Sequence, residues 1–367
     1  MQLKSVIIIG GGLSGLTASL LLNRAGFEVT VIEKKTYPFH RVCGEYISNE
    51  VLPFLRSIDV HIADFQASQI TQLAISSPTG KIFKSPLDLG GFGLSRYTLD
   101  NFLYQKAKAA GVTFLLGVKA NSIRYENDSF KVELSDSAIL NSSLIIAAYG
   151  KRSNLDTNRK FFSRRSPYLG VKYHIKTDFP INVVQLDNFE GGYCGTVKIE
   201  GDRYNLCYLT RNEHLKNHGS LPEMEKQVLF KNPILKARFS NADFLNEKPE
   251  VINEISFEKK PLVEDHILYC GDAAGMISPL CGNGMAMAIH AAKVLSQTII
   301  QHFPNRSAIE QRYQSQWAKL FENRLLAGRL TQKLFGKSVL SELAVKSLNW
   351  VPGLSDQIIK RTHGKPF

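Results

Sequence analysis

Two glycine-rich stretches of the sequence could bring the backbone against a negatively charged ligand. The first is Gly10-Gly11-Gly12-Leu13-Ser14-Gly15, and the second runs from Gly271-Asp272 to Gly282-Asn283-Gly284, far downstream. Because glycine has no side chain, a phosphate can reach the peptide N–H groups there, and a helix that begins at such a turn adds a favourable dipole. Both stretches are therefore candidate binding sites for an anionic cofactor.

The first stretch has the spacing GxGxxG between an expected strand at residues 5–9 and an expected helix at 13–25. In this setting Gly10 permits the tight turn, Gly12 the approach of a pyrophosphate, and Gly15 the packing of helix on strand. A second expected strand ends at Glu33, where an acid can bind ribose hydroxyls. The combination predicts a dinucleotide site, and the alternative is a glycine-rich turn that binds nothing.

The second stretch follows an expected buried strand, HILYC, and opens an expected helix. It resembles the second FAD fingerprint of flavoproteins of the para-hydroxybenzoate hydroxylase type, where Gly-Asp-Ala-Ala precedes a proline and a glycine-rich turn. The resemblance implies that Asp272 binds the ribityl chain, that Pro279 borders the flavin ring, and that the backbone N–H groups of residues 282–284 face the N1 side of the ring. It covers residues 1 to about 300 as a pattern. The predicted FAD-binding residues are Gly10, Gly12, Leu13, Ser14, Gly15, Glu33, Lys34, Arg41, Arg96, Ala120, Asp272, Gly282, Asn283, Gly284 and Met285.

Three of these residues rest on other segments. Arg96 and Asp100 resemble the RxxxD of that family, in which the arginine lies near the cofactor; the alternative is an ion pair at a helix start. The resemblance also implies that the backbone at Ala120 holds the adenine. Arg41 is expected either to pair with the FAD phosphates or to be a solvated loop charge.

The loop that contains Cys43-Gly44-Glu45 resembles two subfamilies. Geranylgeranyl reductases carry a proline and Cys-Gly-Gly in this loop, and flavin halogenases carry Gly-Glu. Cys43 is a catalytic candidate that would face the flavin, unless it only packs. Glu45 would orient the ribityl chain or cap the next helix.

The chain departs from each subfamily pattern. The Asp-Gly motif of the monooxygenases is replaced by Tyr149-Gly150, and no tryptophan occurs before Trp317, so the Trp-x-Trp-x-Ile-Pro of halogenases is missing. Geranylgeranyl reductases have an aromatic-rich strand ending in Phe-Pro, where this chain has only Tyr193.

The catalytic candidates are Cys43, His174, Tyr193 and Pro279. His174 is the acid–base candidate because its ordinary pKa lies near neutrality. Strand alternation places it with Lys172 and Lys176 on a polar face, which argues against a buried catalytic position. Other candidates for the substrate pocket are more often structural; they are Tyr173, Cys194, Tyr208 and Cys281.

The order of the expected elements predicts an α/β fold. A Rossmann-like FAD-binding domain, made of residues 1–75, 96–165 and 255–302, is interleaved with a mixed β-sheet substrate domain of residues 76–95 and 166–254. Residues 303–367 form a helical C-terminal region.

Composition limits the function classes. The formal net charge is +12, but no nucleic-acid-binding signature or zinc-like cysteine spacing is present. No stretch is apolar enough for a membrane span and the start does not resemble a secretion signal, so we predict a cytoplasmic protein. From residue 311 onward there are ten Lys/Arg and three Asp/Glu, which indicates a solvated helical face or, as the alternative, peripheral contact with a membrane.

Taken with the resemblance, these residues predict a flavin monooxygenase that uses NAD(P)H and O2 on a hydrophobic aromatic or polyketide-like molecule. The alternative is an ene-reductase, like the geranylgeranyl reductases, that saturates isoprenoid or lipid double bonds. A third class is a flavin-binding protein without turnover. No second GxGxxG is present, so NAD(P)H is expected to bind transiently, or an external protein to donate the electrons.

Overall fold

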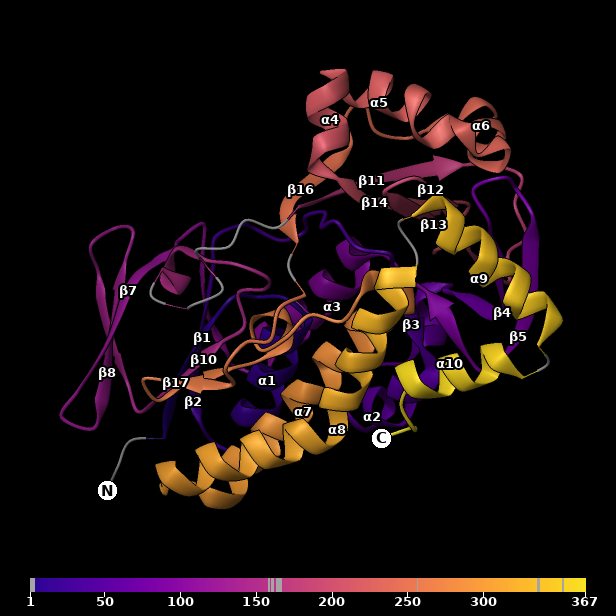
Figure 1. The fold of residues 1–367 in the computed structure, drawn as a ribbon. Helices are drawn as coiled ribbons and strands as arrows, with labels where there is room; N and C mark the ends of the chain where they lie inside the picture. Colours follow the sequence, from indigo (N-terminus) through magenta and orange to yellow (C-terminus); the bar gives the residue numbers. More distant parts are fainter. Residues whose placement is uncertain are drawn as a thin grey trace.

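The computed structural model describes residues 4–157, 159, 162, 167–255, 257–334, 337–351 and 353–367. Two large sheets lie side by side, and helices cover their outer surfaces (Figure 1). Within the described residues, no helix combines the length and the apolar character that crossing a membrane requires.

The first sheet has six strands in the order β17-β18-β10-β1-β2-β6, and only β17 is antiparallel to its neighbour. Its strands are β1 (Ser5–Ile9), β2 (Glu28–Glu33), β6 (Thr113–Leu116), β10 (Leu144–Ala147), β17 (Val263–Glu264) and β18 (Ile267–Tyr269). The central strands β1, β2 and β10 are short apolar runs that are largely buried, as parallel strands covered on both faces require. The predicted strand at 5–9 and the strand ending at Glu33 are confirmed.

Each face of this sheet has its own cover. Val6 and Ile8 of β1 pack with the helices α1 (Leu13–Arg24), α3 (Arg96–Ala109) and α7 (Gly284–His302), while Ile7 and Ile9 pack against a three-stranded sheet. That small sheet consists of β7 (Ala120–Glu126), β8 (Ser129–Leu134) and β9 (Ile139–Ser142).

The second sheet has nine strands in the order β15-β11-β14-β13-β12-β4-β5-β3, with β16 also paired to β11. Its strands are β3 (Tyr46–Ser48), β4 (Ser68–Ser76), β5 (Ile82–Gly93), β11 (Tyr168–Lys176), β12 (Val183–Phe189), β13 (Gly192–Lys198), β14 (Tyr204–Arg211), β15 (Asp243–Phe244) and β16 (Glu250–Ile255). The predicted domain boundaries put residues 46–48 and 68–75 with the FAD-binding domain, but their strands β3 and β4 are paired in this sheet. The division into domains stays a prediction.

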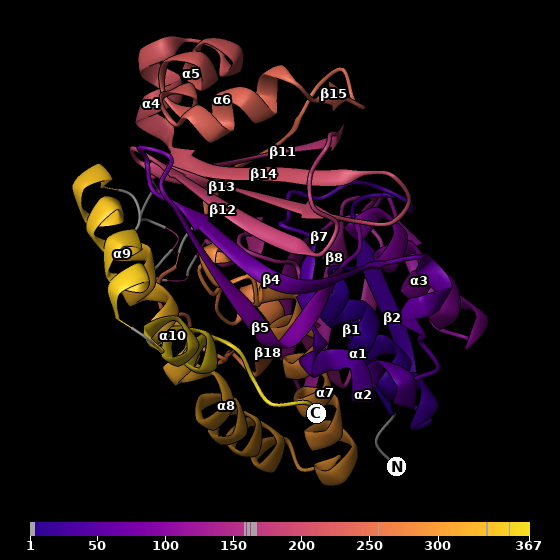
Figure 2. The same cartoon turned by 90° about the vertical axis from the view of Figure 1, so that its right-hand side faces the viewer.

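Helices complete the layers around the second sheet. The outer face is covered by α4 (Asn212–His218), α5 (Leu221–Gln227) and α6 (Pro233–Ser240) (Figure 1). A short helix, α2 (Leu52–Ser57), follows β3. The C-terminal helices α8 (Arg306–Leu334), α9 (Ser338–Trp350) and α10 (Leu354–Thr362) run down the side of the molecule, with α9 and α10 beside β12, β4 and β5 (Figure 2). The mixed α/β fold with C-terminal helices is as predicted.

Candidate functional site

The GxGxxG loop joins β1 to α1, and its glycines serve different purposes. Gly10 has φ +105°, and a Cβ there would lie 2.5 Å from the oxygen of Ala148, while a Cβ on Gly15 would collide with the oxygen of Gly10. A Cβ on Gly12 would meet nothing closer than Arg96 Nη2 at 3.6 Å. Gly10 and Gly15 are therefore required by the backbone, whereas Gly12 leaves the loop open toward a cavity.

A buried cluster of ion pairs surrounds this loop. Glu33, which is 4% exposed, accepts a hydrogen bond from Gly11 N at 2.9 Å and pairs with Arg41 Nη2 at 3.0 Å. Asp100 pairs with Arg41 at 3.1 Å and with Arg96 at 2.7 Å. Arg96 thus forms the helix ion pair considered from the sequence and still lines the cavity beside Gly12.

The second glycine stretch meets the first in space. Gly271 has φ +64°, and a Cβ there would collide with Ser14 Oγ, so the two predicted loops are in contact. Asp272 follows in a short 3-10 helix, Gly271–Ala273. Burial raises the pKa of its carboxyl, and the charge of the nearby Lys260 offsets only part of this rise. Lys260 Nζ donates to the backbone carbonyl oxygen of Asp272 at 2.9 Å, and burial lowers the pKa of this lysine to about 8.

One cavity of about 810 Å³ lies between the two glycine loops and the nine-stranded sheet, a volume typical of cofactor and ligand sites. Most predicted site residues line it: Gly10, Gly12, Leu13, Ser14, Glu33, Lys34, Arg41, Cys43, Arg96, Ala120, Tyr193, Asp272, Pro279, Gly282, Gly284 and Met285. Gly15 instead packs on Gly10. The side chain of Asn283 points away and donates to the oxygen of Thr362 at 3.0 Å.

These residues fit FAD. Gly12 offers an uncovered backbone beside Arg96, as a pyrophosphate requires, and the N-terminus of α7 opens into the same cavity at Gly284. Glu33 lies at the end of β2, where ribose hydroxyls are bound in such folds.

A second buried network, not predicted as a unit, lies at the sheet side of the cavity. Glu45 is fully buried with φ +54°, and its carboxylate binds Lys172 Nζ at 2.6 Å, His174 Nε2 at 2.7 Å and the backbone N of Arg96 at 3.0 Å. Burial alone would raise the pKa of Glu45, but the charge of Lys172 and the bond to His174 outweigh it and lower the pKa to about 2.

This network shows that the polar face expected for the strand of His174 is in fact buried. Alternation was expected to place Lys172 and His174 on a polar face away from a buried site, yet that face points toward the FAD-binding half and both side chains are almost fully buried. The physical reason is Glu45, whose carboxylate compensates the cationic side of the strand. His174 lies behind Glu45 and does not line the cavity. The clue in the sequence was an acid in the loop opposite a Lys-x-His strand.

His40 was missed altogether. Its ring lines the cavity, stacks on Tyr97 with centroids 4.6 Å apart, and meets the edge of the His174 ring at 5.2 Å. Burial lowers the pKa of His40, and the charge of Lys172 lowers it further. No spacing rule connects it to His174.

Two candidates remain as neutral acids in the cavity wall. Cys43 is half-buried, its carbonyl accepts from Asn205 Nδ2 at 3.1 Å, and burial raises the pKa of its thiol. Burial also raises the pKa of Tyr193, which is 4% exposed, well above its usual value.

Of the remaining pocket candidates, Tyr208 also lines the cavity, but its hydroxyl donates to Glu225 of α5 at 2.7 Å on the opposite face of the sheet. Tyr173 does not line the cavity and donates to the same carboxyl at 2.8 Å. Cys194 packs in the same apolar layer as Tyr208, and Cys281 lines a separate small cavity.

The model of the FAD-binding domain family matches residues 4–315, so the chain belongs to this family. It is 23% identical over 358 residues to digeranylgeranylglycerophospholipid reductase 2 of Methanopyrus kandleri, covering 92% of this chain and 88% of that protein. Among solved structures, a geranylgeranyl bacteriochlorophyll reductase-like protein of Thermoplasma acidophilum has a TM-score of 0.76 at 18% identity, covering 99% of this chain and 93% of the other. The flavin-dependent brominase Bmp2 has a TM-score of 0.79 at 17% identity, covering 97% and 92%.

The protein is therefore an FAD-dependent oxidoreductase, and the prediction of FAD is confirmed. At these identities the solved structures show the fold alone. The individual binding and catalytic roles, and NAD(P)H as donor, stay predictions.

Proposed function

We propose that the protein is an ene-reductase that saturates a carbon–carbon double bond of an isoprenoid or other lipid-like substrate. The observation that carries this proposal is the nature of the sheet side of the cavity. The strands present aliphatic side chains there, including Val184, Leu186 and Leu209, and beside them the buried Tyr193 and Cys207 are neutral acids. This wall suits a long apolar substrate and a proton donor better than it suits a base.

Two basic side chains behind the cavity wall are already hydrogen-bonded within the protein. Lys172 and His174 both bind the carboxylate of Glu45. Tyr193 and Cys207, by contrast, stay protonated because burial raises their pKa values.

The reduction needs a hydride and a proton. FAD held between the two glycine loops would, once reduced, be the source of the hydride for one carbon of the double bond. The other carbon would take a proton from Tyr193, whose side chain lines the cavity from β13 and whose hydroxyl is buried. Water then returns the proton to the tyrosine. Pro279 and Gly282 position the cofactor side, and the aliphatic strand residues exclude water.

The similarity to digeranylgeranylglycerophospholipid reductase 2, over most of both chains, supports this choice. The electrons would come from NAD(P)H bound transiently or from a donor protein. Tyr149, which replaces the usual aspartate, donates to Asp156 at 2.6 Å and so does not reproduce a free carboxylate at the cavity wall.

A second candidate is hydroxylation of an aromatic or polyketide-like molecule, and one observation favours it. Gly195 of β13 lines the cavity, and a Cβ there would meet Leu186 only at 3.6 Å and the oxygen of Cys207 at 3.7 Å. The floor beside Tyr193 is therefore flat and could accept an aromatic ring.

Product analysis distinguishes these functions. The purified FAD-containing protein is reduced with NADPH or dithionite without oxygen and given geranylgeraniol in D2O. The expected product gains two hydrogens per reduced bond. With NADPH at least the one donated by the solvent-exchanged Tyr193 is deuterium, and with dithionite both are, because the hydrogen transferred as hydride then also comes from D2O. The Tyr193→Phe variant is expected to lose activity by about 10²-fold or more, as for removal of a general acid, while the control Tyr173→Phe keeps it.

Other outcomes refute the proposal. Incorporation of an atom of oxygen from labelled O2 into an alkylphenol, with no reduction of geranylgeraniol, would establish the hydroxylase. Bound FAD with neither product, from either reductant, would indicate a flavin-binding protein without turnover.

A further inference from the structure

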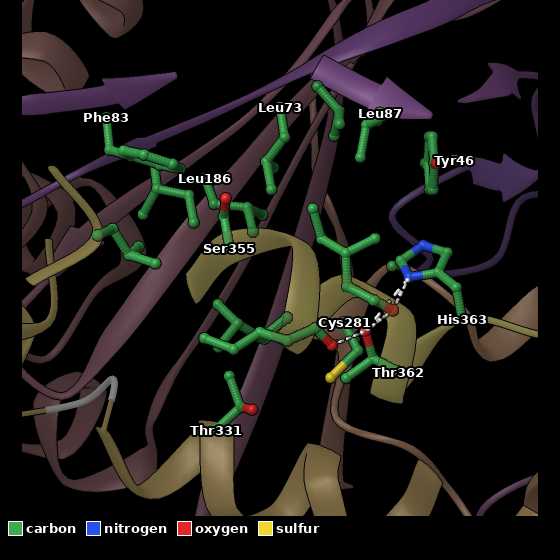
Figure 3. A pocket seen from close by; sticks show the side chains of 17 residues that line it. Tyr46, Leu73, Phe83, Leu87, Leu186, Cys281, Thr331, Ser355, Thr362 and His363 are labelled. Atoms are coloured by element: carbon green, nitrogen blue, oxygen red, sulfur yellow. Dashed lines mark hydrogen bonds between the residues drawn. The ribbon is translucent and has the colours of Figure 1, made fainter. Parts of the chain in front are cut away.

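A second cavity of about 90 Å³ lies between the nine-stranded sheet and the C-terminal helices (Figure 3). Strands β4, β5 and β12 supply one wall with Leu73, Phe83, Leu87 and Leu186, and α10 closes the other side with Ile358. The lining is aliphatic and aromatic, with few polar groups.

The polar groups at its rim carry no charge, and those of Thr331, Thr362 and His363 are hydrogen-bonded within the protein, except for the buried Nε2 of His363. Thr362 Oγ1 donates toward the carbonyl oxygens of Ile358 and Ile359 at 3.1 Å (Figure 3). Burial lowers the pKa of His363 to about 4, so this imidazole is neutral at physiological pH. Thr331 Oγ1 bonds to its own helix at Ala327. A charged lipid headgroup would have no counter-charge in this cavity, whereas a hydrocarbon chain needs none.

This cavity adjoins the large one. Tyr46, Val184, Leu186 and Gly282 line both, and Gly282 belongs to the segment that the cofactor would touch. Both cavities open on the same face of the sheet, so an elongated molecule can cross from one to the other along β12.

We propose that the small cavity binds the apolar end of the substrate's hydrocarbon chain while the reacting part lies in the large cavity. The assignment of the reacting part rests on the proposed function; the affinity for hydrocarbon does not. For scale, an apolar cavity of about 150 Å³ binds benzene, so this one takes the last few carbons of a chain.

The test measures binding without turnover. Straight-chain primary alcohols from hexanol to tetradecanol are titrated into the oxidised, FAD-containing protein, and the change in flavin absorbance gives Kd. Each methylene buried should tighten binding about fourfold, until the end of the chain fills the small cavity and Kd stops falling.

Filling the cavity should move that limit. Ser355 lies in the first turn of α10 and its side chain points into the cavity (Figure 3). Ser355→Leu is therefore expected to stop the improvement at a shorter chain and to weaken binding of the longest alcohols by about tenfold or more. Ser347→Leu, on the exposed side of α9, is the matched control and should bind as the wild type does.

Kd independent of chain length, or the same limit in Ser355→Leu, would overturn the proposal. If chain-length dependence holds but geranylgeraniol is not reduced, the reductase assignment falls and the chain-binding cavity stands.

A different observation, the exposed face of α9, carries a second inference. Ser341, Val345 and Leu348 are buried on one side of this helix, yet on the other side Val339 and Trp350 are 72% and 80% exposed. At 100° per residue, Val339, Leu343 and Trp350 form one stripe. A helix that is apolar on both faces is normally covered on both.

We infer that this stripe docks on an anionic lipid membrane. Leu326 and Leu330 of α8 are also half exposed, and the exposed charged residues between them and Val339 are basic, Lys333 and Lys337. An apolar face bordered by basic residues complements anionic lipid headgroups.

Vesicle sedimentation tests this inference with the full-length protein. Binding is expected to vesicles of phosphatidylglycerol and phosphatidylcholine, with a blue shift of Trp350 fluorescence, and weaker binding to phosphatidylcholine alone. The double variant Leu343→Ser/Trp350→Ser should bind about tenfold or more weakly. Equal binding by this variant, or a wild-type dimer that it converts to monomer, would overturn the inference, the dimer by showing that a second copy covers the stripe.

Discussion

Two buried glutamates lie on opposite faces of β11, and their surroundings differ. Glu45 faces the cavity side and binds Lys172 and His174; the charge of Lys172 and the hydrogen bond from His174 outweigh burial and lower its pKa to about 2. Glu225 faces the outer helices and accepts only from Tyr173 and Tyr208, and burial raises its pKa. Burial is nearly the same at both sites, so the partner decides whether the carboxyl stays charged.

The largest expected effect separates the two glutamates. Glu45→Gln leaves Lys172 buried without a counter-charge and should cost about 3–5 kcal/mol of unfolding free energy. Glu225→Gln keeps an acceptor for both tyrosines and should cost about 1 kcal/mol or less. Urea unfolding at fixed FAD concentration measures both. Equal costs would mean that the charge on Glu45 has no structural role.

The pH dependence of the free energy of unfolding should also distinguish the two glutamates, because their contributions change with pH in opposite directions. Since the folded protein holds the pKa of Glu45 below its unfolded value, this group's stabilisation is complete above about pH 4.5 and is lost as pH falls toward 2, by up to about 3 kcal/mol. The raised pKa of Glu225 means that its contribution decreases as pH rises above about 4.5. Wild type, Glu45→Gln and Glu225→Gln unfolded across pH 3–8 should separate the two slopes; a slope that survives its own substitution contradicts the assignment.

Removing both charges should restore much of the loss. Lys172→Met combined with Glu45→Gln leaves no uncompensated charge, so the double variant should recover about 2 kcal/mol relative to the sum of the single variants. A double-mutant cycle in urea gives this coupling. Additive costs would show that the two side chains act independently.

The smallest effect is expected on the outer face. Tyr173→Phe removes one hydrogen bond to Glu225 and leaves Tyr208 as donor, so it should cost about 1 kcal/mol and leave FAD content unchanged. A loss of flavin absorbance would show that the two faces of β11 are coupled.

The cofactor end of the fold could be predicted because its signals are local. Strand, glycine turn, helix and Glu33 all lie within one short segment, and Gly10 and Gly15 are required by backbone atoms close to them. The two glycine loops are far apart in the chain, but their contact could be expected because both have a backbone suited to binding the same cofactor.

The sheet end could not be predicted in the same way. Strand alternation assigned Lys172 and His174 to one face correctly, but the side on which that face is buried depends on Glu45, 127 residues earlier in the chain from Lys172. Likewise, Asn283 sits in a predicted cofactor segment, yet its side chain turns toward α10 because Thr362 offers an acceptor.

The hydrogen bond between Asn283 and Thr362 joins two segments that are synthesised at different times. The ribosome adds Asn283 79 residues before Thr362, and the ring of Phe367 then stacks on His290 of α7 at 3.8 Å. Until that later segment has emerged and docked, the turn that opens α7 lacks one of its anchors. A nascent chain that already displays both glycine loops would therefore hold its flavin loosely, and firm capture of the cofactor would wait for residues that never touch it.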